Sequence, residues 1–246
     1  MKAKLLAQMN LQDFDLLPED ISSLDERTLV IRKWNWDYAQ AWSFQKACVA
    51  LLQEIPQMRV LICCNHPQVL TNGRGLQKPR KGEVLELVDF DVKNYPTLPF
   101  PLFQIERGGG LTFHHPGQFI FYPIVKLNPK NLSLSKMVDD IFDFSIEVLN
   151  SWGVENLSHE NKLLGLWCGP RKMASMGIAI EKLTTFHGMA LNLTRDAEMM
   201  KALTIMNPCG LTSETYIATE EVLKLPENFL NKFADEFLKK VQHGWK

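Results

Sequence analysis

The sequence predicts an α/β (α+β) domain that mixes long strands with a few helices. Short β-branched and aromatic runs of strand length recur along the chain, bounded by glycine, proline or asparagine. Longer segments carry apolar residues at helical spacing, two of them just behind a residue suited to cap a helix. A chain of 246 residues is long enough to bury a sizeable core. We expect one domain at residues 27–246, preceded by an N-terminal extension at residues 1–26.

Composition and charge narrow the class of protein. Apolar residues make up 46% and charged residues 22%, which is ordinary for a globular protein. The net charge of -1 gives no global attraction to nucleic acid or to an acidic membrane, so neither is expected as a partner. No apolar window approaches the length of a membrane span, and the amino terminus does not read as a secretory signal. Five cysteines without framework spacing indicate a reduced, cytoplasmic protein.

Two strands and a helix are expected in the first quarter of the chain. Residues 28–33 form a short β-branched run, and residues 59–64 form a second compact strand. Between them, Asp37 is suited to cap a helix that ends near Pro56, although Gln45 interrupts its apolar stripe. The segment at residues 65–75 is rich in turn-forming residues and is predicted to be a loop.

Cys63, Cys64 and His66 raise the question of a metal site. Neighbouring side chains on a strand point to opposite faces, so the two cysteines are poorly placed to share one ion. Free cysteine is often buried as a small hydrophobe, and core packing is therefore favoured over metal binding. We expect no metal. A basic run follows the predicted loop and is hypothesised to dock acidic carrier proteins; it comprises Arg74, Lys78, Arg80 and Lys81.

The stretch RGGGLTFHHPGQFIFY, from Arg107 to Tyr122, combines backbone freedom with hydrogen-bonding side chains. Its three glycines let a ligand approach backbone N–H groups closely, and Arg107 adds a permanent positive charge. We predict a ligand-binding loop between a strand at residues 100–106 and a strand at residues 118–127. The pattern is neither a P-loop nor a dinucleotide fingerprint, so phosphate binding is weakly supported. Further donors and acceptors come from Thr112, His114, His115 and Gln118.

The second half of the chain alternates helices with strands. Ser133 or Ser135 is suited to cap a helix that runs to about Trp152, with Gly153 beyond its end. A short helix is expected near residues 197–206, and a closing helix begins after Pro226. Strands are expected at residues 163–168, 173–180 and 187–193, the first two joined by a turn at residues 169–171.

Three residues of this half are candidates for chemistry. Cys209 lies in the turn Asn-Pro-Cys-Gly, where a thiol is exposed enough to act as a nucleophile, although a buried structural thiol is about as well supported. Lys172 precedes an apolar strand that could partly desolvate its amine, but most lysines are merely solvated. His187 could act as an acid, a base or a satisfied core imidazole, and the last is modestly favoured.

Four motifs in order, RGGGLTFHHPGQFIFY, GLWCGPRKMASMGIAI, FHGMALNL and NPCGLTS, are similar to the octanoyl-[acyl carrier protein]:protein octanoyltransferases, also called the lipoate-protein ligase B family. The resemblance covers about residues 28–216 and implies a single catalytic domain at residues 27–246. The implied fold is that of the biotin and lipoate ligases, in which a mixed, twisted sheet flanked by helices carries the acyl pocket.

The resemblance also implies roles for single residues. Cys209 would accept the acyl group, and Lys172 would be its partner. His115 departs from the family pattern, because many relatives have glycine there, and this affects the pocket mouth and the acyl length. The segments that match the family's substrate-binding motifs comprise Arg107, Gly108, Gly109, Gly110, Leu111, Thr112, Phe113, His114, Ser175, Met176, Gly177, His187, Gly188 and Met189.

The activity implied by the family is octanoyl transfer without a cofactor or a metal. The donor would be octanoyl-acyl carrier protein, and the acceptors would be lipoyl domains of 2-oxoacid dehydrogenase complexes or the glycine cleavage H protein. Two alternatives stay open at this point. One is an ATP-dependent lipoate-protein ligase on the same fold, and the other is a non-catalytic protein that binds acyl carriers or lipoyl domains.

Overall fold

Two sheets form the frame of the molecule, which was analysed as a computed structural model. The structure describes residues 5, 7–75, 100–128, 130–160, 164–198, 201 and 215–245. The larger sheet has the strand order β1-β2-β3-β7-β11-β10-β9-β8 and the smaller has the order β5-β4-β6. Only the pairs β2–β3 and β4–β5 are parallel among the described strands. The larger sheet consists of β1 (Ile21–Ser23), β2 (Thr28–Lys33), β3 (Arg59–Cys64), β7 (Gln118–Val125), β8 (Leu157–Glu160), β9 (Gly165–Cys168), β10 (Arg171–Glu181) and β11 (Thr184–Asn192).

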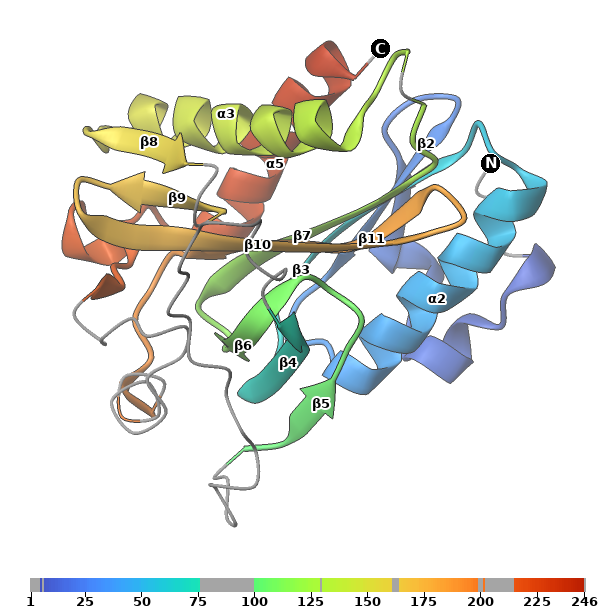
Figure 1. The fold of residues 1–246 in the computed structure, drawn as a ribbon, viewed down its shortest axis with the longest axis horizontal. Coiled ribbons are helices and arrows are strands. Elements are labelled where there is room, and N and C mark those ends of the chain that lie inside the picture. The colour runs from blue at the N-terminus through green and yellow to red at the C-terminus, as the bar shows by residue number, and fades with distance from the viewer. Residues whose placement is uncertain are drawn as a thin grey trace, which may run out of the picture.

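Helices cover both faces of the larger sheet, as the sequence predicted (Figure 1). On one face lie α3 (Leu134–Trp152) and α5 (Phe229–Gly244). The other face carries α2 (Tyr38–Glu54) and the small sheet, made of β4 (Val69–Gly75), β5 (Leu102–Gln104) and β6 (Gly109–His114). Short 3-10 turns occur at Leu11–Phe14, Pro18–Asp20 and Thr219–Glu221.

The predicted Asp37 cap is confirmed, and of the two serines proposed for the next helix it is Ser133 that caps it. The Asp37 side chain accepts a hydrogen bond from the Gln40 backbone N–H at 3.0 Å, and Ser133 accepts one from Lys136 at 3.2 Å. Each bond satisfies a backbone donor that the first turn of a helix leaves unpaired. At the other end of α3, Gly153 has a φ of 102°, which glycine adopts without a steric penalty.

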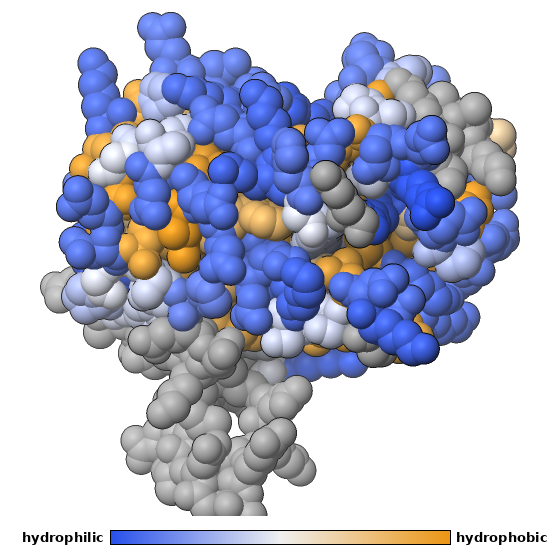
Figure 2. Space-filling view, turned by 90° about the horizontal axis from the view of Figure 1, so that it is seen from above, coloured by the Kyte–Doolittle hydropathy of each residue, from blue (hydrophilic) through white to orange (hydrophobic). Residues whose placement is uncertain are grey.

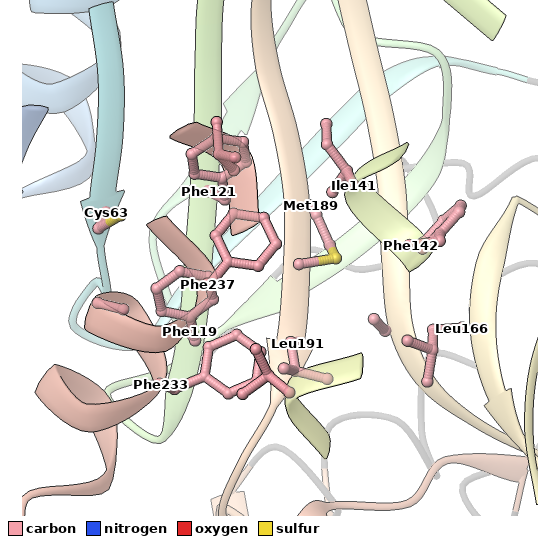
Figure 3. Packing of buried hydrophobic residues seen from close by; sticks show 14 of the residues in the cluster. Cys63, Phe119, Phe121, Ile141, Phe142, Leu166, Met189, Leu191, Phe233 and Phe237 are labelled. Carbon is pink, nitrogen blue, oxygen red and sulfur yellow. The ribbon is translucent and has the colours of Figure 1, made fainter. Parts of the chain in front are cut away.

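The larger sheet divides the hydrophobic core in two. On the side of α3 and α5, the aromatic rings of Phe233 and Phe237 pack against Phe119 and Phe121 of β7 (Figure 3). On the side of α2, alternate residues of the same strands, such as Ile120, pack against the helix. This alternation follows from the two-residue period of a strand, and it makes the central strands apolar on both faces.

The cysteine pair follows the same rule. Cys63 lies in the core beneath α3 and α5, whereas Cys64 lies in the core beneath α2. Burial raises the pKa of Cys63 to about 12 and that of Cys64 well above its ordinary value. Within the described part of the chain, no group of three or more His, Cys, Asp or Glu side chains is arranged to hold a metal ion. Core packing of these cysteines is therefore confirmed.

Two predicted loops are wrong in part, because they contain the strands of the small sheet. Residues 69–75, within the expected loop at 65–75, form β4, and residues 109–114, within the expected ligand loop, form β6. The two strands pair antiparallel, with an irregularity between Asn72 and Gly75. The asparagine and glycine residues of β4 suggested a turn. In the structure they lie at the break in register, so they fit within the paired strands. Of the hypothesised docking patch, Lys78, Arg80 and Lys81 lie outside the described residues.

The described part of the predicted N-terminal extension packs onto the domain. Residues 21–23 form β1 at the edge of the larger sheet, where they pair with β2. Leu5, Leu11 and Leu16 are buried in the core beneath α2. The boundary at residue 26 stays a prediction, but these residues contribute to the core of the domain.

The outer surface above α3 and α5 is mostly hydrophilic, with hydrophobic atoms showing in the gaps between polar side chains (Figure 2). Such a mixture is ordinary for a protein surface. Among the described residues, no helix has the length and apolar character needed to cross a membrane.

Candidate active site

Lys172 lies on the face of the larger sheet that carries α2 and the small sheet, here called the inner face. It reaches this face because β10 is irregular. Lys172 pairs with Trp167 of β9, but the next pair is Ala174 with Leu166, so Met173 is an extra residue. A bulge of this kind reverses the alternation of side chains. Ala174 packs beneath α3 and α5, and Lys172 therefore lies on the opposite face, toward the small sheet. Its side chain is 9% exposed, and its Nζ lies 5.7 Å from the centroid of the Trp167 ring.

His187 is also turned onto this inner face by its backbone. Its φ is 58°, a left-handed value that is uncommon for a residue with a Cβ. The Gln45 side chain of α2 accepts a hydrogen bond from the His187 backbone N–H at 2.8 Å. The His187 Nε2 lies 3.7 Å from Glu106 Oε2. Burial lowers the pKa of His187 to about 3, so the imidazole is neutral near pH 7.

Glu106 stands beside the imidazole at the margin of the small sheet. Its two oxygens accept hydrogen bonds from Lys46 Nζ at 2.6 Å and from Trp42 Nε1 at 3.0 Å. Burial acts to raise its pKa, but these hydrogen bonds outweigh that effect and hold the pKa below its ordinary value. The carboxylate is thus charged near pH 7 and faces a neutral His187.

Arg107 is buried between the two sheets. Its guanidinium donates hydrogen bonds to Thr71 O at 2.8 Å, to Thr71 Oγ1 at 2.9 Å and to Gly108 O at 3.0 Å. A Cβ added at Gly177 of β10 would lie 2.8 Å from Arg107 Cδ, so glycine there permits the close approach. The Gly108 N–H donates to Ile178 O at 3.2 Å, so its donor is already used within the protein.

The predicted binding residues lie on two faces of the larger sheet. Ser175, Gly177 and Gly188 lie on the inner face with Lys172, whereas Met176 and Met189 belong to the core beneath α3 and α5. Figure 3 shows Met189 among those core side chains. Its sulfur accepts a hydrogen bond from Ser145 of α3 at 3.6 Å, so this side chain packs away from Lys172.

The predicted residues of β6 are mostly buried in the small sheet. Leu111, Phe113 and His114 are 5%, 4% and 5% exposed, whereas Thr112 and Gly110 are half-buried. His114 stacks on Tyr38 of α2 with ring centroids 5.9 Å apart. Burial lowers its pKa well below the ordinary value, so this histidine is neutral too.

His115 lies at the end of β6, in the turn toward β7. Its ring is 1% exposed, and its Nδ1 accepts a hydrogen bond from the Gly117 N–H at 3.1 Å. The Nε2 is buried, and the Asn192 side chain lies beside the ring. Burial lowers the pKa of this histidine to about 4. The ring therefore packs as a neutral group against the turn, and its effect on acyl length stays a prediction.

Residues 216–220, here called the strap, cross the ends of β10 and β11 beside Lys172. The Ile217 N–H donates to Lys172 O at 3.1 Å, and the Glu220 N–H donates to Leu193 O at 3.0 Å. The Thr219 hydroxyl donates to Asn192 O at 3.2 Å. Cys209 precedes the strap by seven residues and lies outside the described part of the chain. No sequence pattern predicts the strap, because backbone groups make most of these bonds.

Solved structures define the class to which this fold belongs. Lipoate-protein ligase A bound with ATP superposes with a TM-score of 0.62 at 12% identity, covering 89% of this chain and 84% of that one. A bi-partite lipoate protein ligase from Thermoplasma acidophilum gives a TM-score of 0.58 at 12% identity, covering 87% and 82%. The fold is that of the lipoate-protein ligases, which confirms the mixed sheet flanked by helices.

Sequence comparison identifies the family within that class. A profile of the lipoyl protein ligase A/B catalytic domain matches residues 37–240. A chloroplastic octanoyltransferase of Arabidopsis thaliana, LIP2p2, is 32% identical over 211 residues, or 84% of this chain and 70% of that protein. A probable octanoyltransferase of Pyrobaculum aerophilum is 32% identical over 188 residues, covering 75% and 73%. The chain belongs to the lipoyl protein ligase A/B catalytic domain family, and the prediction of an enzyme is confirmed.

Proposed function

We propose that this enzyme transfers an octanoyl group from octanoyl-acyl carrier protein to the ε-amine of a lysine on a lipoyl domain, with Cys209 as the acyl carrier. The relatives named octanoyltransferase support the transfer, and the NPCG and RKMAS motifs support the two catalytic residues. Lipoyl domains of 2-oxoacid dehydrogenases and the glycine cleavage H protein are the proposed acceptors. No ATP is required, because conversion of a thioester to an amide is downhill.

The observation that carries the proposal is the position of Lys172. The bulge at Met173 turns this lysine onto the face of the larger sheet that carries the small sheet, and the strap pairs with its backbone. The seven residues from Cys209 to Tyr216 span at most about 25 Å when fully extended. The chain that carries the thiol is thus tethered within reach of the lysine, which supports a Cys/Lys pair.

The proposed mechanism has two steps. The Cys209 thiolate attacks the thioester carbonyl, a new C–S bond forms, and the carrier's thiolate leaves and takes up a proton. The lipoyl-domain amine then attacks this acyl-enzyme, a C–N bond forms, the Cys209 thiolate is expelled, and the amine loses a proton. As a cation, Lys172 stabilises the Cys209 thiolate; as a neutral amine, it accepts the proton of the incoming amine.

Backbone donors of the glycine segment, residues 108–110, are the proposed stabilisers of the tetrahedral oxyanion. The hydrogen bond from Gly108 to Ile178 removes the Gly108 N–H from this role. The Gly177 N–H is directed at β11 within the sheet, so Gly109 and Gly110 remain as candidates. Loss of one such donor costs about 2.7 to 4 kcal/mol in other enzymes.

A mass measurement with cysteine variants tests the function. The protein is mixed with octanoylated carrier protein without ATP, and the intact mass is measured. We expect wild type to gain one octanoyl group, Cys209→Ser to gain none and to lose transfer, and Cys168→Ser to keep both. Cys168 is a suitable control because it is half-buried and burial raises the pKa of its thiol. Equal activity of the two variants, or an absolute requirement for ATP, would refute the thioester mechanism in favour of an ATP-dependent ligase.

A further inference from the structure

A series of hydrogen bonds leads from Arg107 into the interior of the protein. The guanidinium donates to Thr71 Oγ1 at 2.9 Å, and this hydroxyl lies 3.4 Å from His114 Nε2. The His114 Nδ1 lies 3.1 Å from Gln118 Oε1. Thr71, His114 and Gln118 are 0%, 5% and 3% exposed, so water does not compete for these bonds.

The series continues from Gln118 to the strap. Gln118 Nε2 donates to Phe113 O at 3.1 Å and to Asn192 Oδ1 at 2.9 Å. A carbonyl oxygen only accepts, so the bond to Phe113 fixes which end of the Gln118 amide carries the nitrogen. The Asn192 amide is fixed in the same way, because its Nδ2 lies 3.5 Å from Ile217 O.

In each hydrogen bond of this series, the donor lies on the Arg107 side and the acceptor on the Ile217 side. Gln118 offers an oxygen to His114, so the His114 Nδ1 carries a proton and its Nε2 is free to accept from Thr71. A second proton on this ring would place a charge beside the Arg107 guanidinium. Hydrogen bonds that run in one direction in a dry interior polarise and strengthen one another. The two sheets and the strap are thereby joined by a single polar connection.

Ile217 is the point where this connection meets the catalytic lysine. The Ile217 N–H donates to Lys172 O, and the Ile217 C=O accepts from the Asn192 side chain. Both backbone polar groups of this residue are therefore hydrogen-bonded. Thr219 adds a hydrogen bond to Asn192 O. We propose that Asn192 is a positioning residue. It holds the strap on β10 beside Lys172 and in register with residues 107–110, here called the Arg107 segment. The inference rests on the proposed function, because its importance for catalysis depends on the Cys209 thioester.

Two substitutions at one position test the role of Asn192. Asn192→Ala removes both side-chain bonds, whereas Asn192→Asp keeps an acceptor for Gln118 but cannot donate to Ile217 O. The matched control is Thr185→Val on the same strand. The Thr185 hydroxyl donates to Pro123 O at 2.7 Å and accepts from Val125 N at 3.2 Å, at the far end of β11 from the strap. All three variants lose buried hydrogen bonds, so similar losses of melting temperature are expected.

Three measurements then separate positioning from stability. We expect both Asn192 variants to slow acyl-enzyme formation about tenfold or more, with KM for octanoyl-acyl carrier protein unchanged. The pH midpoint for iodoacetamide alkylation of Cys209 is expected to rise toward about 8.5, the value of a free thiol. Amide hydrogen exchange at residues 216–220 is expected to accelerate. Thr185→Val should change none of the three.

The outcomes distinguish this inference from the proposed function. If the Asn192 variants match Thr185→Val in acylation rate, alkylation midpoint and strap exchange, Asn192 is structural only and the inference is overturned. If the wild type acquires no octanoyl group and its Cys209 titrates as a free thiol, the proposed function fails, and the catalytic role of Asn192 fails with it. Faster strap exchange with an unchanged acylation rate and midpoint also overturns the positioning role.

Discussion

Gly177 is the residue at which the larger sheet comes closest to the Arg107 side chain. A Cβ there would lie 2.8 Å from Arg107 Cδ and 2.9 Å from Gly108 O. To relieve these two close contacts, the Arg107 side chain and the backbone at Gly108 would have to move. We expect Gly177→Ala to reduce octanoyl transfer about tenfold or more, chiefly through a higher KM, as measured by steady-state kinetics.

The control for Gly177→Ala is a crowded glycine outside the site. A Cβ at Gly244 would lie 2.3 Å from the Phe144 ring, so Gly244→Ala also disturbs packing. This variant should lower the melting temperature and leave KM unchanged. A normal KM in Gly177→Ala would contradict the role given to the Arg107 segment.

Gln45 shows what sequence reasoning at single positions misses. In the sequence it interrupts the apolar stripe of a predicted helix, yet in the structure it is fully buried and bonds the His187 backbone. Lys172 and His187 were both named from the sequence as candidates. Their direction was not predictable, because a bulge and a left-handed φ reverse the ordinary alternation of a strand.

The hairpin between β10 and β11 is an element whose turn and sequence disagree. Lys182 and Leu183 have φ values of 48° and 65°, the arrangement of a two-residue turn that favours asparagine and glycine. Each residue with a Cβ in this region costs about 1 kcal/mol or more. We expect the double variant Lys182→Asn, Leu183→Gly to stabilise the protein by about 1–2 kcal/mol, which raises the melting temperature by about 2–8 °C.

A single variant separates backbone strain from surface hydrophobicity in this turn. Leu183 is 56% exposed, so Leu183→Ala removes an exposed apolar group but keeps the left-handed residue. We expect no gain in melting temperature from Leu183→Ala by calorimetry. A gain equal to that of the double variant would show that strain in the turn is not the cause.

Elements with a clear period were predicted from sequence, and polar or glycine-rich ones were not. The strands β2 and β3 and the helices α2 and α3 were found where apolar spacing and capping residues agreed. The strands β4 and β6 were missed because their glycine and asparagine residues are typical of turns. Their pairing with each other, and their position over the inner face of the larger sheet, depend on contacts far apart in the chain.

At the scale of the whole molecule, the site is a boundary between two sheets. The larger sheet supplies Lys172, His187 and Asn192, the small sheet supplies His114, and the connection between β5 and β6 supplies Arg107. The interior between them is polar, unlike the hydrophobic core beneath α3 and α5. Buried polar groups in such an interior depend on hydrogen bonds within the protein, and burial keeps the histidines neutral. Its stability should therefore depend on pH more than that of an apolar core.

Buried neutral histidines make the folded state sensitive to acid. Burial lowers the pKa of His66 and His115 to about 4 and of His187 to about 3, and it lowers that of His114 well below its ordinary value. A histidine in the unfolded chain titrates near about 6.5. Between these values the unfolded chain binds more protons than the folded protein, so the free energy of unfolding falls as pH falls. Above about 6.5 neither state is protonated, and this stabilisation is fully present.

Each such histidine is expected to contribute a slope of about 1.4 kcal/mol per pH unit between about pH 6 and its folded pKa. Together their effect is comparable with the stability of a typical domain, about 5–15 kcal/mol. We expect urea unfolding to show a steep loss of stability from pH 6.5 to 5. His66→Gln should reduce this slope by about 1.4 kcal/mol per pH unit. A flat free energy of unfolding over this range would mean that these imidazoles are not held neutral by burial.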